Sequence, residues 1–468
     1  MNILHVEDEA DWFERIVRPA LNDIGAKKVF HAISYNSALA TIKSQNIDYV
    51  ILDLAIPIDD ETHTPDISNG LNLASYIRVN YPGTPLLILT GQQTEEAVEQ
   101  FVEDEDVTIF WDGKARSLVK VRPKRSLDKV MDLLQIAIEE LVAIDSIEID
   151  ARGCNLDLLE ERVIKLFCKH NDAIAAKVQS LDDGLSSSKV LRVNLMSDLG
   201  QEFHWALAKI DSKKDIDIED SNFNLYINKL PVGSFPNLLN QYSAGCADKK
   251  GVFYQFATKY SSDYFKVLLE NEDIAIQVLK RMRIILDTWF KNKQVKQVKV
   301  SDIRRLLCSD LKYSNLCSSI EGFNCDEFEF KKLSINSSIQ HGDLHGKNIL
   351  VSEEYTPIVI DYGDIKITTS VLDVVTLELS PYFHPAVAQK FKPSIELFEN
   401  WFDEDKHLQL SLFPNVSKCL MEWRNNNSFM PREYTVTVYA YAVRQLTYPN
   451  TNKKFAHALI KSAISAFR

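Results

Sequence analysis

The stretch HGDLHGKN at residues 341–348, followed by ILV at 349–351 and VIDYGD at 359–364, decides how the C-terminal half of this chain is interpreted. It supplies Asp343, then Asn348 five residues later, and then Asp361 directly after an apolar run. Phosphoryl transfer from ATP needs a carboxylate near the attacking hydroxyl, and an amide and a second carboxylate that hold Mg²⁺. A solvated loop with incidental acids is the alternative, and the spacing and the flanking apolar runs disfavour it.

These motifs resemble those of the aminoglycoside phosphotransferases, relatives of the protein kinases, over roughly residues 170–468. The resemblance implies a bilobal protein-kinase-like fold (α+β), with an N-lobe over 171–260 and a helical C-lobe over 261–468. It implies that Asp343 is the catalytic base and that Asn348 and Asp361 are the metal ligands. His341 and Asp373 would be structural residues that brace the catalytic loop. His345 lies inside the loop and is left open as a residue that faces substrate.

An ATP site also needs phosphate-binding and adenine-binding segments. The Ser-rich stretch 181–193 predicts a hairpin turn over the phosphates, although an ordinary hairpin turn is an open alternative. The run WALAKI at 205–210 predicts a strand that ends in the phosphate-binding lysine, and 251–257 predicts the strand that leads to the hinge. The expected ATP-binding residues are Gly184, Ser186, Ser187, Ser188, Lys209, Tyr254 and Phe256. The acid that pairs with Lys209 is left open, because Glu219 and Asp220 follow it closely.

The N-terminal half shows a second pattern, in which polar residues follow short apolar runs. Strand-like runs at 3–6, 49–52, 85–89 and 107–111 alternate with amphipathic helical stretches, which predicts a parallel α/β sheet with helices on both faces. Ligands of such sheets gather at the carboxyl ends of the strands. The residues there are Glu7, Asp8, Asp53, Thr90 and Lys114. Acids hold a hard cation, and Lys and Thr take phosphate oxygens, so a Mg²⁺ and phosphoryl site is expected.

This half resembles the response-regulator receiver domain over about residues 1–143, which implies a doubly wound parallel five-stranded α/β fold. The resemblance implies that Glu7, Asp8 and Asp53 bind Mg²⁺ and that Asp53 is the phosphoacceptor. It also implies switch roles for Thr90, Lys114 and Trp111. The loop at 58–69 is longer and more acidic than usual, and Ala115 replaces the usual Pro. A receiver-like domain that no longer accepts phosphate is the alternative.

Composition limits the function classes. The chain has 468 residues, 45% of them hydrophobic, which predicts two or three domains with sizeable cores. A net charge of -13 argues against a general nucleic-acid binder and against an anionic membrane surface as partner. No signal peptide or membrane-spanning run is apparent, and the seven scattered cysteines fit free thiols, so a cytoplasmic location is expected.

The segments between the two halves give further expectations. Ser126 is a candidate N-cap for a helix over 127–142, a connector with a helix over 156–170 follows, and Pro19 should kink the helix over 10–24. The cations of 114–125 predict either a nucleic-acid patch or, preferably, an intramolecular contact with acidic regions. A buried helix is expected over 434–446, in which Arg444 either forms a core salt bridge or reaches the active cleft.

Together these patterns predict a receiver fused to an ATP-dependent phosphotransferase, with ATP and Mg²⁺ as cofactors. Phosphorylation of Asp53 would gate the kinase half, with a histidine kinase or a small phosphodonor as donor and an unidentified small molecule or protein as acceptor. A homodimer through the receiver is open. The rival function is a phosphorylation-controlled binding module with an inactive kinase half. Aminoglycoside resistance is a third, less favoured reading.

Overall fold

The computed structural model describes residues 1–62, 64–90, 107–181, 188–256, 260, 262–291, 293–319, 325–390, 392–426 and 430–467. The chain is mixed α/β and forms two compact units. The first unit comprises 1–217 and 237–256, and the second comprises 218–236 and 257–468.

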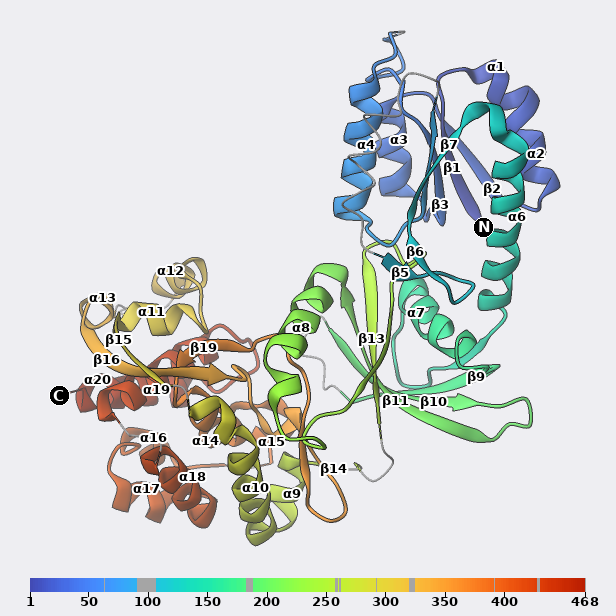
Figure 1. The fold of residues 1–468 in the computed structure, drawn as a ribbon. Helices are drawn as coiled ribbons and strands as arrows, with labels where there is room; N and C mark the ends of the chain where they lie inside the picture. The colour runs from blue at the N-terminus through green and yellow to red at the C-terminus, as the bar shows by residue number, and fades with distance from the viewer. Residues whose placement is uncertain are drawn as a thin grey trace. The chain divides into compact units, whose positions relative to one another are not determined.

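The first unit begins with a five-stranded parallel sheet of order β2-β1-β3-β4-β7. Its strands are β1 (Asn2–Val6), β2 (Lys28–Ala32), β3 (Tyr49–Asp53), β4 (Leu86–Thr90) and β7 (Val119–Pro123). Every residue of β3 is buried, as expected for a strand covered on both faces. Figure 1 shows α3 and α4 on one face of the sheet and α1, α2 and α6 on the other. The helices are α1 (Ala10–Trp12), α2 (Arg18–Asp23), α3 (Tyr35–Ser44), α4 (Ile67–Asn80) and α6 (Leu127–Asp145).

The expected kink at Pro19 takes the form of a π-helical turn. The segment η1 (Phe13–Val17) separates α1 from α2, and Pro19 lies in the first turn of α2, where its missing N–H costs least. At the other end of the sheet, a 3₁₀ turn, η2 (Lys124–Ser126), leads from β7 into α6. The predicted helix over 127–142 is therefore confirmed, although the Ser126 side chain makes no capping bond.

The prediction that 107–111 forms the fifth strand of this sheet is wrong. β5 (Val107–Ile109) instead pairs antiparallel with β6 (Ala115–Ser117) in a separate hairpin, and β7 lies parallel to β4. The reason lies in the edge position of β7. An edge strand buries one side-chain row and exposes the other, so VKVRP alternates apolar and cationic residues rather than forming an apolar run. The charges made it look like a loop.

A second sheet completes the first unit, in the order β12-β13-β11-β10-β9-β8. The strands β9 (Ala175–Ser180), β10 (Lys189–Met196), β11 (Glu202–Ser212), β13 (Lys249–Gln255) and β12 (Leu238–Tyr242) pair antiparallel. The sixth strand, β8 (Glu148–Asp150), comes from the connector and pairs parallel with β9, which the sequence did not indicate. The helix α7 (Leu158–Lys169) begins with a capping box between Asp157 and Glu160.

The two sheets of the first unit share one hydrophobic core. It contains Ile51 and Leu87 of the parallel sheet, Phe167 of α7, and Phe253 of the second sheet. The ring of Phe167 stacks on that of Phe253 at 4.1 Å between centroids. A second core fills the other face of the parallel sheet alone, between β1, β3, α3 and α4.

Buried polar contacts join the same two sheets. The Trp111 indole Nε1 donates to the Ala244 carbonyl at 2.8 Å, and Trp111 is fully buried. The Gly83 N–H donates to Ala247 O at 2.6 Å, and the Gly245 N–H donates to Gly83 O at 2.7 Å. A Cβ at Gly245 would lie 2.6 Å from the Trp111 ring, so only glycine permits this approach.

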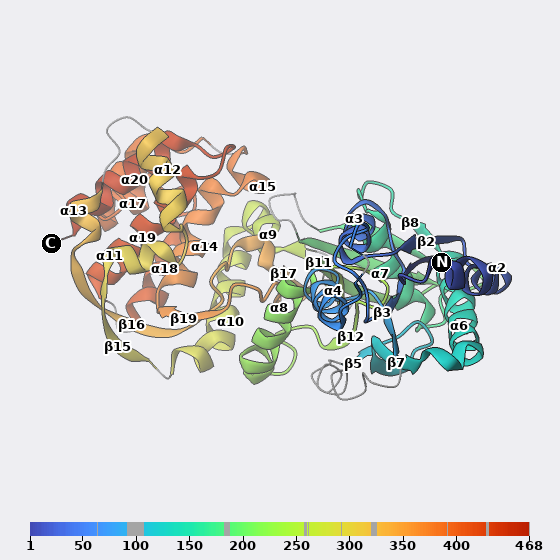
Figure 2. The ribbon, with the colours of Figure 1, turned by 90° about the horizontal axis from the view of Figure 1, so that it is seen from above.

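The second unit is mostly helical. Its strands form two three-stranded sheets, β14-β17-β18 and β15-β16-β19. They are β14 (Ser262–Asp263), β15 (Gln294–Lys299), β16 (Lys332–Gln340), β17 (Ile349–Val351), β18 (Pro357–Val359) and β19 (Lys366–Thr369). The predicted helix over 434–446 is confirmed as α19 (Pro431–Leu446), which packs on β16 within a large apolar core. Figure 2 shows the helices gathered around α19.

The remaining helices of this part are α8 (Lys213–Leu225), which spans the boundary between the units, and eleven that lie within the second unit. They are α9 (Tyr264–Glu270), α10 (Glu272–Phe290), α11 (Val300–Arg305), α12 (Asp310–Ser319), α13 (Asp326–Glu329), α14 (Leu372–Phe383), α15 (Pro385–Ala388), α16 (Ile395–Glu399), α17 (Glu404–Leu410), α18 (Pro414–Asn426) and α20 (Lys453–Ala466). In the part of the chain that the structure describes, none of the helices has the length and apolar character to span a bilayer.

Candidate functional site

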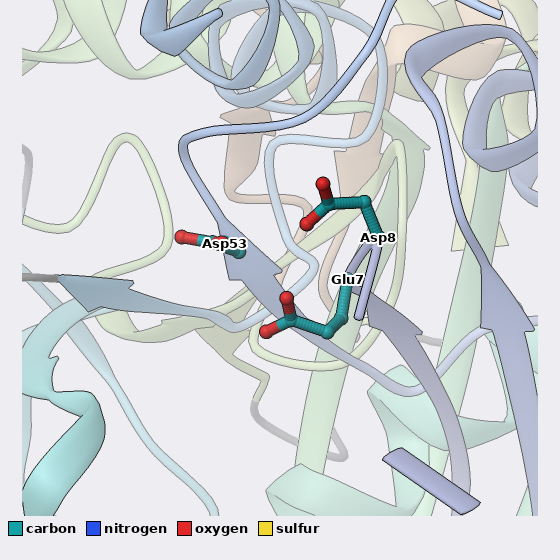
Figure 3. A group of neighbouring side chains, drawn as sticks. All are labelled: Glu7, Asp8 and Asp53. Atoms are coloured by element: carbon teal, nitrogen blue, oxygen red, sulfur yellow. The ribbon is translucent and has the colours of Figure 1, made fainter. Parts of the chain in front are cut away.

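Three acids converge at the carboxyl ends of β1 and β3. Glu7 and Asp8 follow β1, Asp53 ends β3, and each offers a carboxylate oxygen within 4.8 Å of the others. Figure 3 shows the three side chains as close neighbours. Glu7 is fully buried and Asp53 nearly so. Oxygen-only ligands at this spacing suit a hard divalent cation such as Mg²⁺.

The lysine of this cluster is Lys124, not the expected Lys114. Lys124 Nζ donates to Asp53 Oδ2 at 2.7 Å and lies 2.8 Å from Glu7 Oε2. Lys114 is exposed in the turn of the β5–β6 hairpin, where its N–H contacts Asp112. The correction follows from the misassigned strand. Lys124 directly follows β7, the true fifth strand, and therefore takes the place that Lys114 was predicted to hold.

The electrostatics of the cluster favour a bound cation. Burial, together with the charge of Asp53, raises the pKa of Glu7 to about 7. Burial also raises the pKa of Asp53, against the effect of its hydrogen bond from Lys124. Burial lowers the pKa of Lys124, but its bonds to the two acids outweigh this, so the net pKa is raised. One lysine thus incompletely offsets the buried acids, and a divalent cation would complete the compensation.

The other two switch residues have different outcomes. The Thr90 backbone ends β4, but its side chain lies outside the described part of the chain. Trp111 lies after β5, buried and hydrogen-bonded to Ala244, because the hairpin that carries it packs on the second sheet. Its switch role stays a prediction.

In the second unit, the loop after β16 is braced by one buried carboxylate. Asp373 Oδ2 accepts the His341 N–H at 2.8 Å, and Asp373 Oδ1 accepts the Gly342 N–H at 3.0 Å. The His341 ring contributes a contact from Nε2 to Ile360 O at 3.0 Å. Gly342 has φ +88°, and a Cβ there would lie 2.2 Å from the Asp364 carbonyl. The loop is thus held close against the 360–364 segment.

Two further hydrogen bonds tie the three motif residues together. Asn348 Nδ2 donates to the Asp343 carbonyl at 2.9 Å, and the Ile360 N–H donates to the Asn348 carbonyl at 3.1 Å. The next residue, Asp361, has φ +65°, in the left-handed region that non-glycine residues seldom adopt. Such strain is characteristic of functional loops. Asp343, Asn348 and Asp361 therefore lie on adjoining segments with fixed backbones.

The Asp343 carboxylate has a cationic partner from a distant helix. Arg444 of α19 donates from Nη1 to Asp343 Oδ1 at 2.9 Å, and His345 Nε2 lies 3.7 Å from Asp343 Oδ2. Burial alone would raise the pKa of Asp343, but the charge of Arg444 and of the neighbouring histidines holds it well below its usual range. Of the two roles left open for Arg444, the salt bridge is observed, and its partner is the motif residue Asp343.

The predicted nucleotide residues lie mainly in the six-stranded sheet. Lys209 is buried near the end of β11, Tyr254 lies on β13, and Phe256 follows that strand. Ser188 precedes β10 and its hydroxyl donates to Asp211. Gly184, Ser186 and Ser187 lie outside the described residues.

The two acids left open as partners of Lys209 lie on the helix α8. Glu219 is buried on α8, the helix that directly follows β11. One turn later, Asn222 Nδ2 donates to the Tyr362 carbonyl at 2.7 Å. The second half of α8 is thereby attached to the segment that carries Asp361.

A family model matches part of the chain. Residues 3–109 match the model described as the response regulator receiver domain. The match ends within the β5–β6 hairpin, before the fifth strand. A comparison with proteins of curated function found no match to this sequence.

Several solved structures are similar to parts of the chain, and three of them are described next. Aminoglycoside phosphotransferase APH(4)-Ia, as a thermostable mutant in its apo form, is 10% identical with a TM-score of 0.40, over 62% of this chain and 94% of that chain. Choline kinase LicA from Streptococcus pneumoniae is 10% identical with a TM-score of 0.36, over 66% and 98%. NtrX from Brucella abortus, in complex with ATP, is 20% identical with a TM-score of 0.22, over 35% and 33%. With the acid cluster and the parallel sheet, the family match establishes that residues 3–109 belong to a response regulator receiver domain.

Proposed function

We propose that the chain is an ATP-dependent phosphotransferase controlled by phosphorylation of its own receiver. In this proposal residues 1–143 are the receiver, 144–170 the connector, 171–260 the N-lobe and 261–468 the C-lobe of a kinase-like domain. The acceptor is a small-molecule or protein hydroxyl. A histidine kinase or a small phosphodonor supplies the phosphoryl group for the receiver.

The observation that carries the proposal is the linked geometry of Asp343, Asn348 and Asp361. The Asn348 side chain holds the Asp343 backbone, and the Asn348 backbone holds Ile360, next to Asp361. Asp343 would accept the proton of the attacking hydroxyl as its oxygen bonds to the γ-phosphorus and the bond to the ADP oxygen breaks. The oxygen donors of Asn348 and Asp361 fit Mg²⁺, which would neutralise phosphate charge. His341 and Asp373 would hold the loop in register.

The N-lobe residues would bind the nucleotide. Lys209 would contact the ATP phosphates. Gly184, Ser186, Ser187 and Ser188 would cover the phosphates, and the backbone near Tyr254 and Phe256 would face adenine. The support is the order of Ser188, Lys209 and Tyr254 along the chain, beside or within β10, β11 and β13.

In the receiver, Asp53 would be the phosphoacceptor. An Asp53 oxygen would attack the donor phosphorus as the bond to the donor nitrogen or acyl oxygen breaks. Glu7, Asp8 and Asp53 would hold Mg²⁺, since their oxygens converge within 4.8 Å. Lys124 would contact the bound phosphoryl group in the role first expected of Lys114, with Thr90 as the switch hydroxyl.

A continuous path links Asp53 to the N-lobe inside the first unit. Lys124 contacts Asp53 and begins the 3₁₀ turn η2, which leads into α6. Along α6, Glu140 pairs with Lys169 of α7, and the Asp145 carbonyl accepts from Lys165 Nζ at 3.0 Å. The helix α7 packs against β13 through the Phe167–Phe253 stack. A phosphoryl group that draws Lys124 away from Glu7 would act on this path.

Turnover measurements test the kinase proposal. Asp343→Asn should abolish Mg²⁺-dependent ADP formation while ATP still binds, and Asp361→Ala should also weaken Mg²⁺–ATP binding. Asp364→Asn is the matched control, because that carboxylate lies in the same motif but is 62% exposed. Wild-type protein that is neither stabilised by Mg²⁺–ATP nor able to form ADP would refute the activity.

Intact-mass analysis after acetyl phosphate treatment tests the receiver proposal. One phosphoryl group should appear on wild-type protein and on Asp59→Asn, an exposed-loop control, but not on Asp53→Ala. Lys124→Gln should reduce labelling and Lys114→Gln should leave it unchanged. The reverse order of the two lysine variants would restore Lys114 to the site.

A second candidate function is a binding module with an inactive kinase-like half. The observation that favours it is the Arg444 salt bridge, which engages one oxygen of the carboxylate that would receive the hydroxyl proton. In that case Asp343→Asn and wild type would bind ATP alike, and neither would form ADP.

A further inference from the structure

A pocket of about 360 Å³ lies in the first unit, away from the acid cluster, where the β5–β6 hairpin, β7 and α6 meet. Four cations line it: Arg116 from the hairpin, Lys120 and Arg122 from β7, and Lys129 from α6. These residues belong to the basic stretch and the helix that follows it, for which the proposed function has no use.

The positive charge of this pocket is only partly compensated. Arg116 pairs with Asp112, while Glu140, the other acid of the lining, pairs with Lys169 outside the pocket. Lys120, Arg122 and Lys129 form no ion pair with any described acid. Burial and the charges of Arg116 and Arg122 lower the pKa of Lys120. Like charges held together in a chain of net charge -13 indicate a site that an anion would stabilise.

Apolar groups stand beside the cations. Phe110, Leu133 and Ile136 also line the pocket, and Ile136 is 57% exposed. The Arg116 guanidinium lies 4.7 Å from the Phe110 ring centroid, and Arg116 Nε is buried without a hydrogen-bond partner among the described residues. A ligand that fits both features has several negative charges and an apolar ring system, and 360 Å³ is within the range of small-molecule sites.

We infer that this pocket binds a nucleoside phosphate, with the phosphate groups on Lys120, Arg122 and Lys129 and the base or sugar on the apolar side. This site is independent of the ATP site of the proposed kinase. The position of the pocket would let a bound ligand regulate the receiver. Arg122 is two residues from Lys124, and Phe110 packs on Trp111 with 4.8 Å between ring centroids. A ligand bound to Arg122 and Phe110 would therefore lie next to the residues that contact Asp53 and to those that contact the second sheet.

Calorimetric titration of the full chain in EDTA tests the inference, because nucleotide binding at the kinase site should need Mg²⁺. The probes are GDP, guanosine tetraphosphate and cyclic di-GMP, with inorganic pyrophosphate as the charge-only comparison. At least one nucleotide should bind, and Lys120→Gln/Arg122→Gln should weaken it at least tenfold, an effect of two lost charge-assisted contacts. Lys28→Gln, on the opposite edge strand β2, is the matched control and should bind as wild type.

Three outcomes overturn the inference. The first is no binding of any nucleotide at 1 mM, a concentration that detects sites with a Kd of about 1 mM or tighter. The second is equal affinity for pyrophosphate and the nucleotides, which would mean that the apolar side contributes nothing. The third is a concentration-dependent dimer in light scattering that Lys120→Gln/Arg122→Gln dissolves, which would make a second copy of the chain the occupant.

Discussion

Replacing Asp48 by alanine should destabilise the receiver sheet and the six-stranded sheet together. Asp48 Oδ1 accepts from Arg162 Nη1 of α7 at 2.7 Å, and Asp48 Oδ2 accepts the Asn2 N–H at 2.6 Å. Both partners of the ion pair are at least nine-tenths buried. Without the carboxylate, Arg162 keeps the Gly245 carbonyl at 2.8 Å, while its next acid, Asp145, is 3.9 Å away.

The free energy of unfolding lost in Asp48→Ala follows from the charge of Arg162, which would remain buried without its acid. Removing one partner of a buried pair costs about 3–5 kcal/mol, because the other charge stays buried without compensation. The double variant Asp48→Ala/Arg162→Met removes that charge and should be more stable than Asp48→Ala alone. Asp150→Ala is the control, because it breaks an ion pair in the same unit whose arginine, Arg152, is 90% exposed, so little change is expected.

Native-state hydrogen exchange with mass spectrometry is the assay, since it resolves each strand. If the shared core makes one cooperative unit, Asp48→Ala should lower the opening free energy of β3 and of β11 by the same amount. Lost protection in β3 with wild-type protection in β11 would refute the shared unit, and a double variant less stable than Asp48→Ala would refute the stranded-charge argument.

Three further predictions concern the two candidate sites. Arg444→Gln should move the acidic limb of the kcat/KM profile upward by about 1 pH unit or more, because Arg444 holds the pKa of Asp343 down while burial raises it; an unmoved limb would count against Asp343 as the base. The Mg²⁺ affinity of the receiver, measured by calorimetry, should increase by up to about tenfold for each unit by which the pH is raised toward 7, because Glu7, with its pKa raised to about 7, must lose its proton. Glu7→Gln should flatten this pH dependence, and an equally steep profile for Glu7→Gln would contradict the role of Glu7. Gly342→Ala should cost about 1–3 kcal/mol, read as a lowered Tm, since its Cβ would lie 2.2 Å from the Asp364 carbonyl at φ +88°; an unchanged Tm would contradict the close approach.

The sequence predicted the acid cluster well because each acid ends an apolar run. Buried parallel strands are continuous in hydrophobicity, and their carboxyl ends meet at one edge, so Glu7, Asp8 and Asp53 could be grouped without coordinates. Lys124 was missed because its strand lies at the sheet edge. Its cationic alternation concealed the strand, and the apolar run at 107–111 took its place. The alternation of valine with cations over 119–122 was the available signal.

The C-terminal motif residues also lie close together in the sequence, but the residues that surround them in the structure do not. Asp343, Asn348 and Asp361 lie within nineteen positions of one another, so their spacing could be read directly. Arg444 lies 101 residues from Asp343, and nothing in the helix around it distinguishes a partner of Asp343 from an ordinary core arginine. Tertiary packing alone decides that contact. For the same reason the residues of the shared core of the first unit could not be listed from the sequence, since they come from segments far apart in the chain.

The free energies of burial and of allosteric coupling limit how a phosphoryl group on the receiver could act on the proposed kinase half. Separating the receiver sheet from the six-stranded sheet would expose Trp111, which is buried. It would also break the buried ion pair between Arg162 and Asp48. Burial of one large apolar side chain contributes about 1.5–3 kcal/mol, and the shared core contains many. Allosteric couplings are typically about 1–3 kcal/mol. A phosphoryl group on Asp53 therefore has too little free energy to release the receiver, and we expect it to act by shifting Lys124 and α6 against α7 while the two sheets stay joined.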